Sequence, residues 1–288
     1  MEWKNAKIFI IVLLSVLNVV LLGLNYRRHQ ENTLTPNQEK AVFQVLSQNG
    51  ISLYTDLQTK FSPMKKISLS IPVYSKDELK RMFFDGEDTT VTVENTEVEK
   101  IIIKSKTKVL TMKGNRGRLV FPSGTANHQK LDKNIAKQDA EKFMQSLGSK
   151  LGSFEFGNIT KTEEGFVVEY FGKYKGDLVF ANAYRITITE KGITSADFPF
   201  FYPSGYTGEK KDICFSDEAL FTFMKEYRKL EEKKPVTITK MELGYDFLEQ
   251  EELTQDSVVK LLPCYRIYIM GQEKPYIINA YTNEMISN

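Results

Sequence analysis

The chain is poor in the residues that most often build metal sites and nucleophilic centres. Its 288 residues include two cysteines, Cys214 and Cys264, and two histidines, His29 and His128. A zinc site needs about four Cys, His or carboxylate ligands, so this inventory argues against a metal. It also leaves little for a Ser-His-Asp or Cys-His mechanism, and no glycine-rich phosphate loop or nucleophile elbow is present. We therefore expect no cofactor, no metal and no enzymatic activity.

An excess of charge of either sign is also missing. The chain carries 39 basic and 37 acidic residues, and the two kinds are interleaved along the sequence. A nucleic-acid-binding protein would show basic residues gathered into a patch or stripe. We therefore expect no nucleic-acid partner.

The two cysteines, Cys214 and Cys264, allow one disulfide at most. A bond between them could form in an exported domain, but a chain of this length can bury its own core without one. Buried free thiols are the alternative reading of the same pair.

The N-terminal region contains a long uncharged run, from Ile8 to Leu24. As a helix, residues 6–26 would span about 31 Å, which matches a hydrocarbon core of about 30 Å. We predict a transmembrane helix over 8–26, preceded by a cytoplasmic tail over 1–7. A cleaved signal peptide is the alternative, but no small-residue cleavage site follows the run. The expected location is the cell membrane, single-pass, with the N-terminus inside and the large domain outside.

Two polar residues interrupt the run, Ser15 and Asn18. Polar side chains in a membrane helix can bind another helix, with about 0.6 to 2 kcal/mol each. We predict that they contact a partner helix together with Leu14 and Leu22. An Asn that a single span simply tolerates is the alternative.

The segment 27–125 is predicted to form a membrane-proximal α+β domain. Thr35-Pro36-Asn37-Gln38 and Ser75-Lys76-Asp77-Glu78 are capping boxes that should each begin a helix. β-rich runs separate and follow them, and they lie at 67–71, 89–93, 98–104, 108–112 and 119–121.

The second half contains a weak internal repeat of one amphipathic helix followed by strands. The first helix covers 134–147 and the second begins at Ser216. The strands lie at 154–160, 166–174, 179–189, 236–245, 264–270 and 275–281. We predict an α+β fold in which repeated units each pack one helix on an antiparallel meander sheet, with tandem units at about 126–210 and 211–288.

Two further segments could carry a function. Phe200, Phe201 and Tyr202 lie in the most aromatic segment outside the apolar run, which predicts a binding surface or, alternatively, a buried loop between the two units. Acidic clusters at 163–164 and 249–252 could supply a general acid and base.

The order of several motifs resembles the YycI family. These are Trp3 and Lys4 before the apolar run, the strand end Ile71-Pro72-Val73, and the paired α+β units. Residues 276–286 resemble the last hairpin of PepSY-type units, with Asn283 in place of the usual glycine. The resemblance implies a non-catalytic regulator of the WalK (YycG) sensor histidine kinase of Gram-positive bacteria, with a related YycH-like sister protein as a second partner.

The expected function is therefore that of a membrane-anchored, extracytoplasmic regulatory protein of a two-component system. It would bind a sensor histidine kinase and shift its signalling state. One alternative is an extracytoplasmic module that binds a peptide or a cell-wall fragment, in the cleft between the units or on the aromatic segment. A second is an extracytoplasmic hydrolase built on carboxylates.

Overall fold

The computed structural model describes residues 3–31, 33–94, 99–230, 234–248, 259–272 and 274–286. The class is mixed α+β. The helices are α1 (Trp3–Glu31), α2 (Pro36–Gln48), α3 (Lys76–Phe83), α4 (Lys133–Leu147), the 3-10 helix η1 (Gly148–Leu151) and α5 (Ser216–Leu230). The strands are β1 (Ile51–Leu53), β2 (Met64–Ser70), β3 (Thr90–Glu94), β4 (Lys100–Lys104), β5 (Val109–Lys113), β6 (Arg116–Val120), β7 (Ser153–Lys161), β8 (Gly165–Tyr174), β9 (Asp177–Thr189), β10 (Gly192–Pro199), β11 (Tyr202–Lys211), β12 (Val236–Asp246), β13 (Val259–Ile269), β14 (Tyr276–Asn279) and β15 (Met285–Ile286).

Local signals begin the helices where the sequence predicts. Thr35 and Gln38 form a complete capping box at α2, and Ser75 and Glu78 form another at α3. Each box satisfies backbone N–H groups that have no partner inside the helix. Asp132 caps α4, because its carboxylate accepts from two backbone N–H groups of the first turn.

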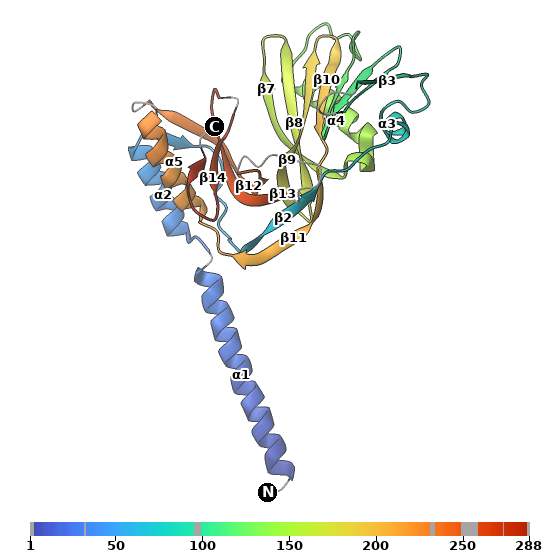
Figure 1. Ribbon diagram of the computed structural model, residues 1–288. Helices are drawn as coiled ribbons and strands as arrows, with labels where there is room; N and C mark the ends of the chain where they lie inside the picture. Colours follow the sequence, from blue (N-terminus) through green and yellow to red (C-terminus); the bar gives the residue numbers. More distant parts are fainter. Residues whose placement is uncertain are drawn as a thin grey trace.

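All the strands join one sheet, whose main path is β11-β2-β13-β12-β9-β10-β6-β5-β4-β3. Most neighbours are antiparallel, but β1 pairs with β12 in parallel, and so does β9. The β9–β12 pairing involves two residue pairs, Gly244 with Leu178 and Tyr245 with Val179. The two halves of the sheet diverge from this short junction in Figure 1. We call the half with α3, α4 and β3–β10 the first unit, and the half with α2, α5, β1 and β12–β15 the second unit.

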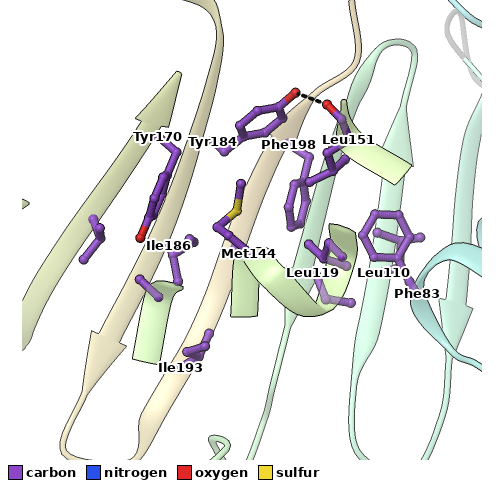
Figure 2. Close-up of a cluster of buried hydrophobic side chains, with 14 of the residues drawn as sticks. Phe83, Leu110, Leu119, Met144, Leu151, Tyr170, Tyr184, Ile186, Ile193 and Phe198 are labelled. Atoms are coloured by element: carbon purple, nitrogen blue, oxygen red, sulfur yellow. Dashed lines mark hydrogen bonds between the residues drawn. The ribbon is translucent and has the colours of Figure 1, made fainter. Parts of the chain in front are cut away.

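The first unit is held by an apolar core between α4 and one face of its strands. Met144 of α4 lies among Tyr170, Tyr184 and Ile186 in Figure 2. The hydroxyl of Tyr184 donates to the carbonyl of Leu151 at 3.2 Å, so this buried polar group is satisfied.

The second unit has its own apolar core, under α2 and α5. Leu46 of α2, Phe223 of α5 and Ile267 of β13 are fully buried there. Figure 1 shows α2 and α5 together on the side of this unit that is turned away from the first unit. On the other face of the strands, none of the helices within the described ranges covers either half.

The segments of the predicted domain 27–125 are distributed over both units. α2 and β1 belong to the second core, because Ile51 pairs with Val236 at the start of β12. α3 and β3–β6 belong to the first core, because β6 pairs with β10. Within the predicted units 126–210 and 211–288, α4 is followed by β7–β10 and α5 by β12–β15.

The prediction of a transmembrane helix over 8–26 is corrected by the structure. α1 extends away from the sheet in Figure 1. Over the described stretches of the chain, no helix combines the length and the apolar character needed to cross a membrane. The predicted single-pass anchor and the cell-membrane location derived from it are therefore not supported.

Candidate functional site

A row of polar side chains crosses the helix-free face of the first unit at right angles to its strands. Strand pairing places its members directly opposite one another from β5 to β7. We call this the polar row, and its residues are Thr111, Arg118, Asp197, Arg185, Glu169 and Asn158. Their sequence neighbours Leu110, Leu119, Ala196, Ile186 and Val168 belong to the core under α4. Because side chains alternate along a strand, the polar row faces away from that core.

Charges alternate along the middle of the polar row. Arg118 lies 3.7 Å from Asp197, and Arg185 lies 2.9 Å from Glu169. The arginine side chains are 61% and 57% exposed, so these are surface ion pairs. Such pairs contribute about 0 to 1 kcal/mol each and can rearrange at little cost.

Two hollows follow the polar row where the second unit approaches it. One of about 430 Å³ is bounded by β5, β6, β9 and β10, and by Asp246 and Phe247 of the second unit. The other, of about 480 Å³, is bounded by β7–β9, by Arg266 of β13 and by Ile277 of β14. Arg185 lines both hollows. We call the two together the inter-unit groove.

The second unit contributes a buried ion pair to the wall of the groove. Nε and Nη2 of Arg266 both donate to Oδ2 of Asp246, the former at 3.2 Å. The guanidinium also lies 4.3 Å from the ring centroid of Phe180 and 5.2 Å from that of Phe171. Burial acts to lower the pKa of Arg266, but the charge of Asp246, its hydrogen bonds and the neighbouring Tyr268 together outweigh burial, and the pKa is raised. The cation is thus held in a fixed place between the two units.

A second polar contact joins the two units, between β12 and β7. Nζ of Lys240 on β12 donates to the carbonyl of Gly157 on β7 at 2.7 Å and lies 2.7 Å from Glu242. Burial raises the pKa of the Glu242 carboxyl, and Lys240 and Arg266 oppose the rise. Oε2 of Glu242 and the hydroxyl of Tyr268 are buried without a hydrogen-bond partner among the described residues.

The aromatic segment is mostly interior. Phe200 is 4% exposed and Phe201 is 5% exposed, whereas Tyr202 is 44% exposed. Phe200 packs in the first core, and Phe201 stacks edge-on against Phe247 of the second unit. Of the three aromatic residues predicted to form a surface, Tyr202 alone is exposed. The rings of Phe200 and Phe201 are covered, as the alternative of a buried loop between the units predicts.

The disulfide that the two cysteines allow is absent, as in the reading of free thiols. Cys214 and Cys264 are free thiols. Cys214 lies on the helix-covered side, where its carbonyl accepts from the hydroxyl of Tyr265. Cys264 faces the opposite side, against Phe171 and Phe180. The sheet itself separates the two sulfurs, and burial raises the pKa of both thiols, as expected for unreactive cysteines.

The residues predicted to contact a partner helix lie on α1. The Ser15 hydroxyl donates to the carbonyl of Ile11, and the Asn18 amide donates to that of Leu14. Both side chains thus bond within their own helix. Leu14 and Leu22 are 52% and 68% exposed.

One of the two acidic clusters lies within the described residues. Glu163 and Glu164 lie in the turn between β7 and β8, and residues 249–252 lie outside the described residues. Within the described ranges, no group of three or more His, Cys, Asp or Glu side chains is placed to hold a metal ion.

The sequence did not predict the polar row. Alternation does mark its members as the polar positions of predicted strands, for example Thr111 between Leu110 and Met112. The order in which six strands bring these positions together depends on pairing between distant segments, which alternation does not encode.

Comparison with solved structures identifies the fold only. An uncharacterized protein from Eubacterium rectale is similar at a TM-score of 0.55 and 14% identity, over 83% of this chain and 90% of that one. The C-terminal domain of YpeB from Bacillus megaterium aligns at a TM-score of 0.44 and 14% identity, over 74% of this chain and 96% of that domain. The second score is too low to decide for PepSY-like units. No known family profile and no curated protein sequence matches the chain, so the YycI resemblance stays a prediction.

Proposed function

We propose that this protein is a non-catalytic regulatory protein that binds another protein in the inter-unit groove. One observation carries the proposal: two hollows of about 430 and 480 Å³ share Arg185 as a lining residue and lie between walls contributed by different units. Concave sites between packed units, with a few fixed polar groups, are the usual places for recognition. The Arg266–Asp246 pair supplies such a fixed group.

The partner that the YycI resemblance suggests is a sensor histidine kinase, with a YycH-like protein as a second partner. A binding protein shifts a kinase between signalling states only if it binds the two states with different affinities. Regulation therefore requires that the groove prefer one state of the kinase.

The test is site-specific photo-crosslinking in cells that express the full chain with a sensor kinase. A photo-reactive residue replaces Thr160, which lines the groove, or Lys142, which lies on α4 on the other side of the sheet. The expected result is a kinase adduct from position 160 and none from position 142. Equal adducts from both positions, or no kinase adduct, would overturn the groove as the contact site.

A second candidate function uses the same groove. The volume of the hollows also suits a free peptide or a cell-wall fragment, bound as a signal rather than as part of a partner. A saturable rise in melting temperature with such a fragment, but not with the kinase, would favour this candidate.

A further inference from the structure

The groove carries positive charge that its own acidic residues do not balance. Three cations are paired, as Arg118 with Asp197, Arg185 with Glu169 and Arg266 with Asp246. Three more line the hollows: Lys113 and Arg116 at the β5–β6 turn, and Lys274 before β14. Among the residues that the structure describes, no ion pair involves these three. The surplus charge therefore lies at the two ends of the groove.

The length of the groove points to an extended ligand. The polar row crosses six strands, and neighbouring strands lie about 4.8 Å apart, so its ends are about 24 Å apart. An extended peptide of about seven residues covers that distance at about 3.3 Å per residue. A compact small molecule would occupy one hollow and leave the surplus charge at the other end unused.

The two walls of the groove differ in polarity, and an extended peptide can match both. The polar row forms one wall. The second unit contributes apolar surface through half-buried Phe247 and Ile277, and charged groups through the Arg266–Asp246 pair and Lys274. Successive side chains of an extended chain point to opposite sides. A segment that alternates acidic and apolar residues therefore matches both walls at once.

Arg185 lies near the middle of the polar row and lines both hollows. It is 57% exposed and contacts Glu169 through one nitrogen, Nη2. A guanidinium has five N–H donors in a planar fork, so it can keep Glu169 and still bind an incoming carboxylate.

We infer that the inter-unit groove binds an extended acidic segment of the partner protein, about seven residues long. Its carboxylates pair with Lys113 and Arg116 at one end and with Lys274 at the other. The inference rests on the proposed function and adds the chemistry of the segment that is recognised.

The experiment measures fluorescence anisotropy of two labelled octapeptides with the full chain. One peptide alternates Glu with Val, and the other has Gln in place of each Glu. We expect the acidic peptide to bind at least about tenfold more tightly, with an affinity that falls as salt rises. The double variant Lys113→Glu/Arg116→Glu should weaken binding by about tenfold or more, and Lys274→Glu by a smaller factor.

The matched control is Lys142→Glu, the same charge reversal at an exposed residue of α4, on the other side of the sheet from the groove. It should leave the affinity unchanged, and thermal unfolding verifies that each variant is folded. Equal binding of the two peptides, or equal loss in the control, would overturn the inference. So would groove-dependent binding of heparin without binding of the acidic peptide, since the occupant would then be a polysaccharide.

The peptide-binding and crosslinking experiments can fail independently. A kinase adduct from position 160 that survives the double charge reversal keeps the groove as a contact site but removes the acidic segment. Binding of the acidic peptide without any kinase adduct keeps the segment chemistry and removes the kinase as its source.

Discussion

The two faces of the first unit come from the same strands, yet they differ in nearly every physical property. Ile186 and Leu119 lie under α4 and are at most 2% exposed. Their neighbours Arg185 and Arg118 face the groove and are more than half exposed. Burial of apolar surface stabilises the first face, at roughly 25 cal/mol per Å². The second face retains charges that contribute little to stability and are therefore available for recognition.

The largest expected effect comes from breaking the one ion pair in the groove that is buried. Asp246→Ala leaves the Arg266 guanidinium without its anion in a site that is 8% exposed. We expect a loss of about 3–5 kcal/mol in the free energy of unfolding, measured by urea denaturation. Asp197→Ala, which removes the exposed partner of Arg118, is the control and should cost less than about 1 kcal/mol. Similar losses in both variants would contradict the contrast.

Two consecutive residues of β9, Arg185 and Ile186, should differ in how much they contribute to stability. Ile186→Ala opens a cavity in the core under α4, and the expected loss is about 2–5 kcal/mol. Arg185→Ala removes an exposed groove residue, and the expected change in stability is within about 0.5 kcal/mol. Calorimetry of both variants measures the difference. A large loss for Arg185→Ala would show that the groove face also carries stability.

A smaller effect is expected where the two units meet. A Cβ on Gly244 would lie 2.6 Å from Cε2 of Phe180 and 2.8 Å from the carbonyl oxygen of Leu178. Gly244→Ala should therefore cost about 1–3 kcal/mol by overpacking, measured as a lower urea midpoint. Adding Phe180→Leu makes space and should recover part of that loss. No recovery would place the strain in the backbone contact instead.

The smallest effect concerns pH. Burial raises the pKa of Glu242 above its ordinary value of 4.5, so the neutral carboxyl favours the folded state. That stability is fully present below the ordinary value and is lost as pH rises through the raised pKa. The melting temperature of Glu242→Gln should therefore rise relative to that of the wild type as the pH increases above that ordinary value. Thr160→Ala, which removes no titratable group, controls for general pH effects, and a difference for Glu242→Gln that stays constant with pH would contradict the prediction.

Much of the secondary structure could be predicted from short stretches of sequence. The capping boxes at Thr35 and Ser75 begin helices where expected, and the helix predicted at 134–147 corresponds to α4 at Lys133–Leu147. These signals act over three or four residues, so no knowledge of the rest of the chain is needed.

Much of the candidate site could not be predicted. Aromatic composition left an exposed surface and a buried loop open for Phe200 and Phe201, and only the packing of the first core and of Phe247 decides for burial. Two cysteines left a disulfide and free thiols open, and the structure decides for free thiols because the sheet separates the two side chains. An apolar run suggested a membrane crossing, which no described helix supports. Composition shows which side chains are available, but not what packs against each one.

The sequence by itself determined the α+β class, the helix starts and the alternation of polar and apolar positions along the strands. Only the tertiary structure decided that β1 would pair with β12 and that the polar positions of six strands would align into one row. The physical reason is range. Caps and periodicity depend on residues within one or two turns, whereas register depends on which distant strands bury their apolar faces together.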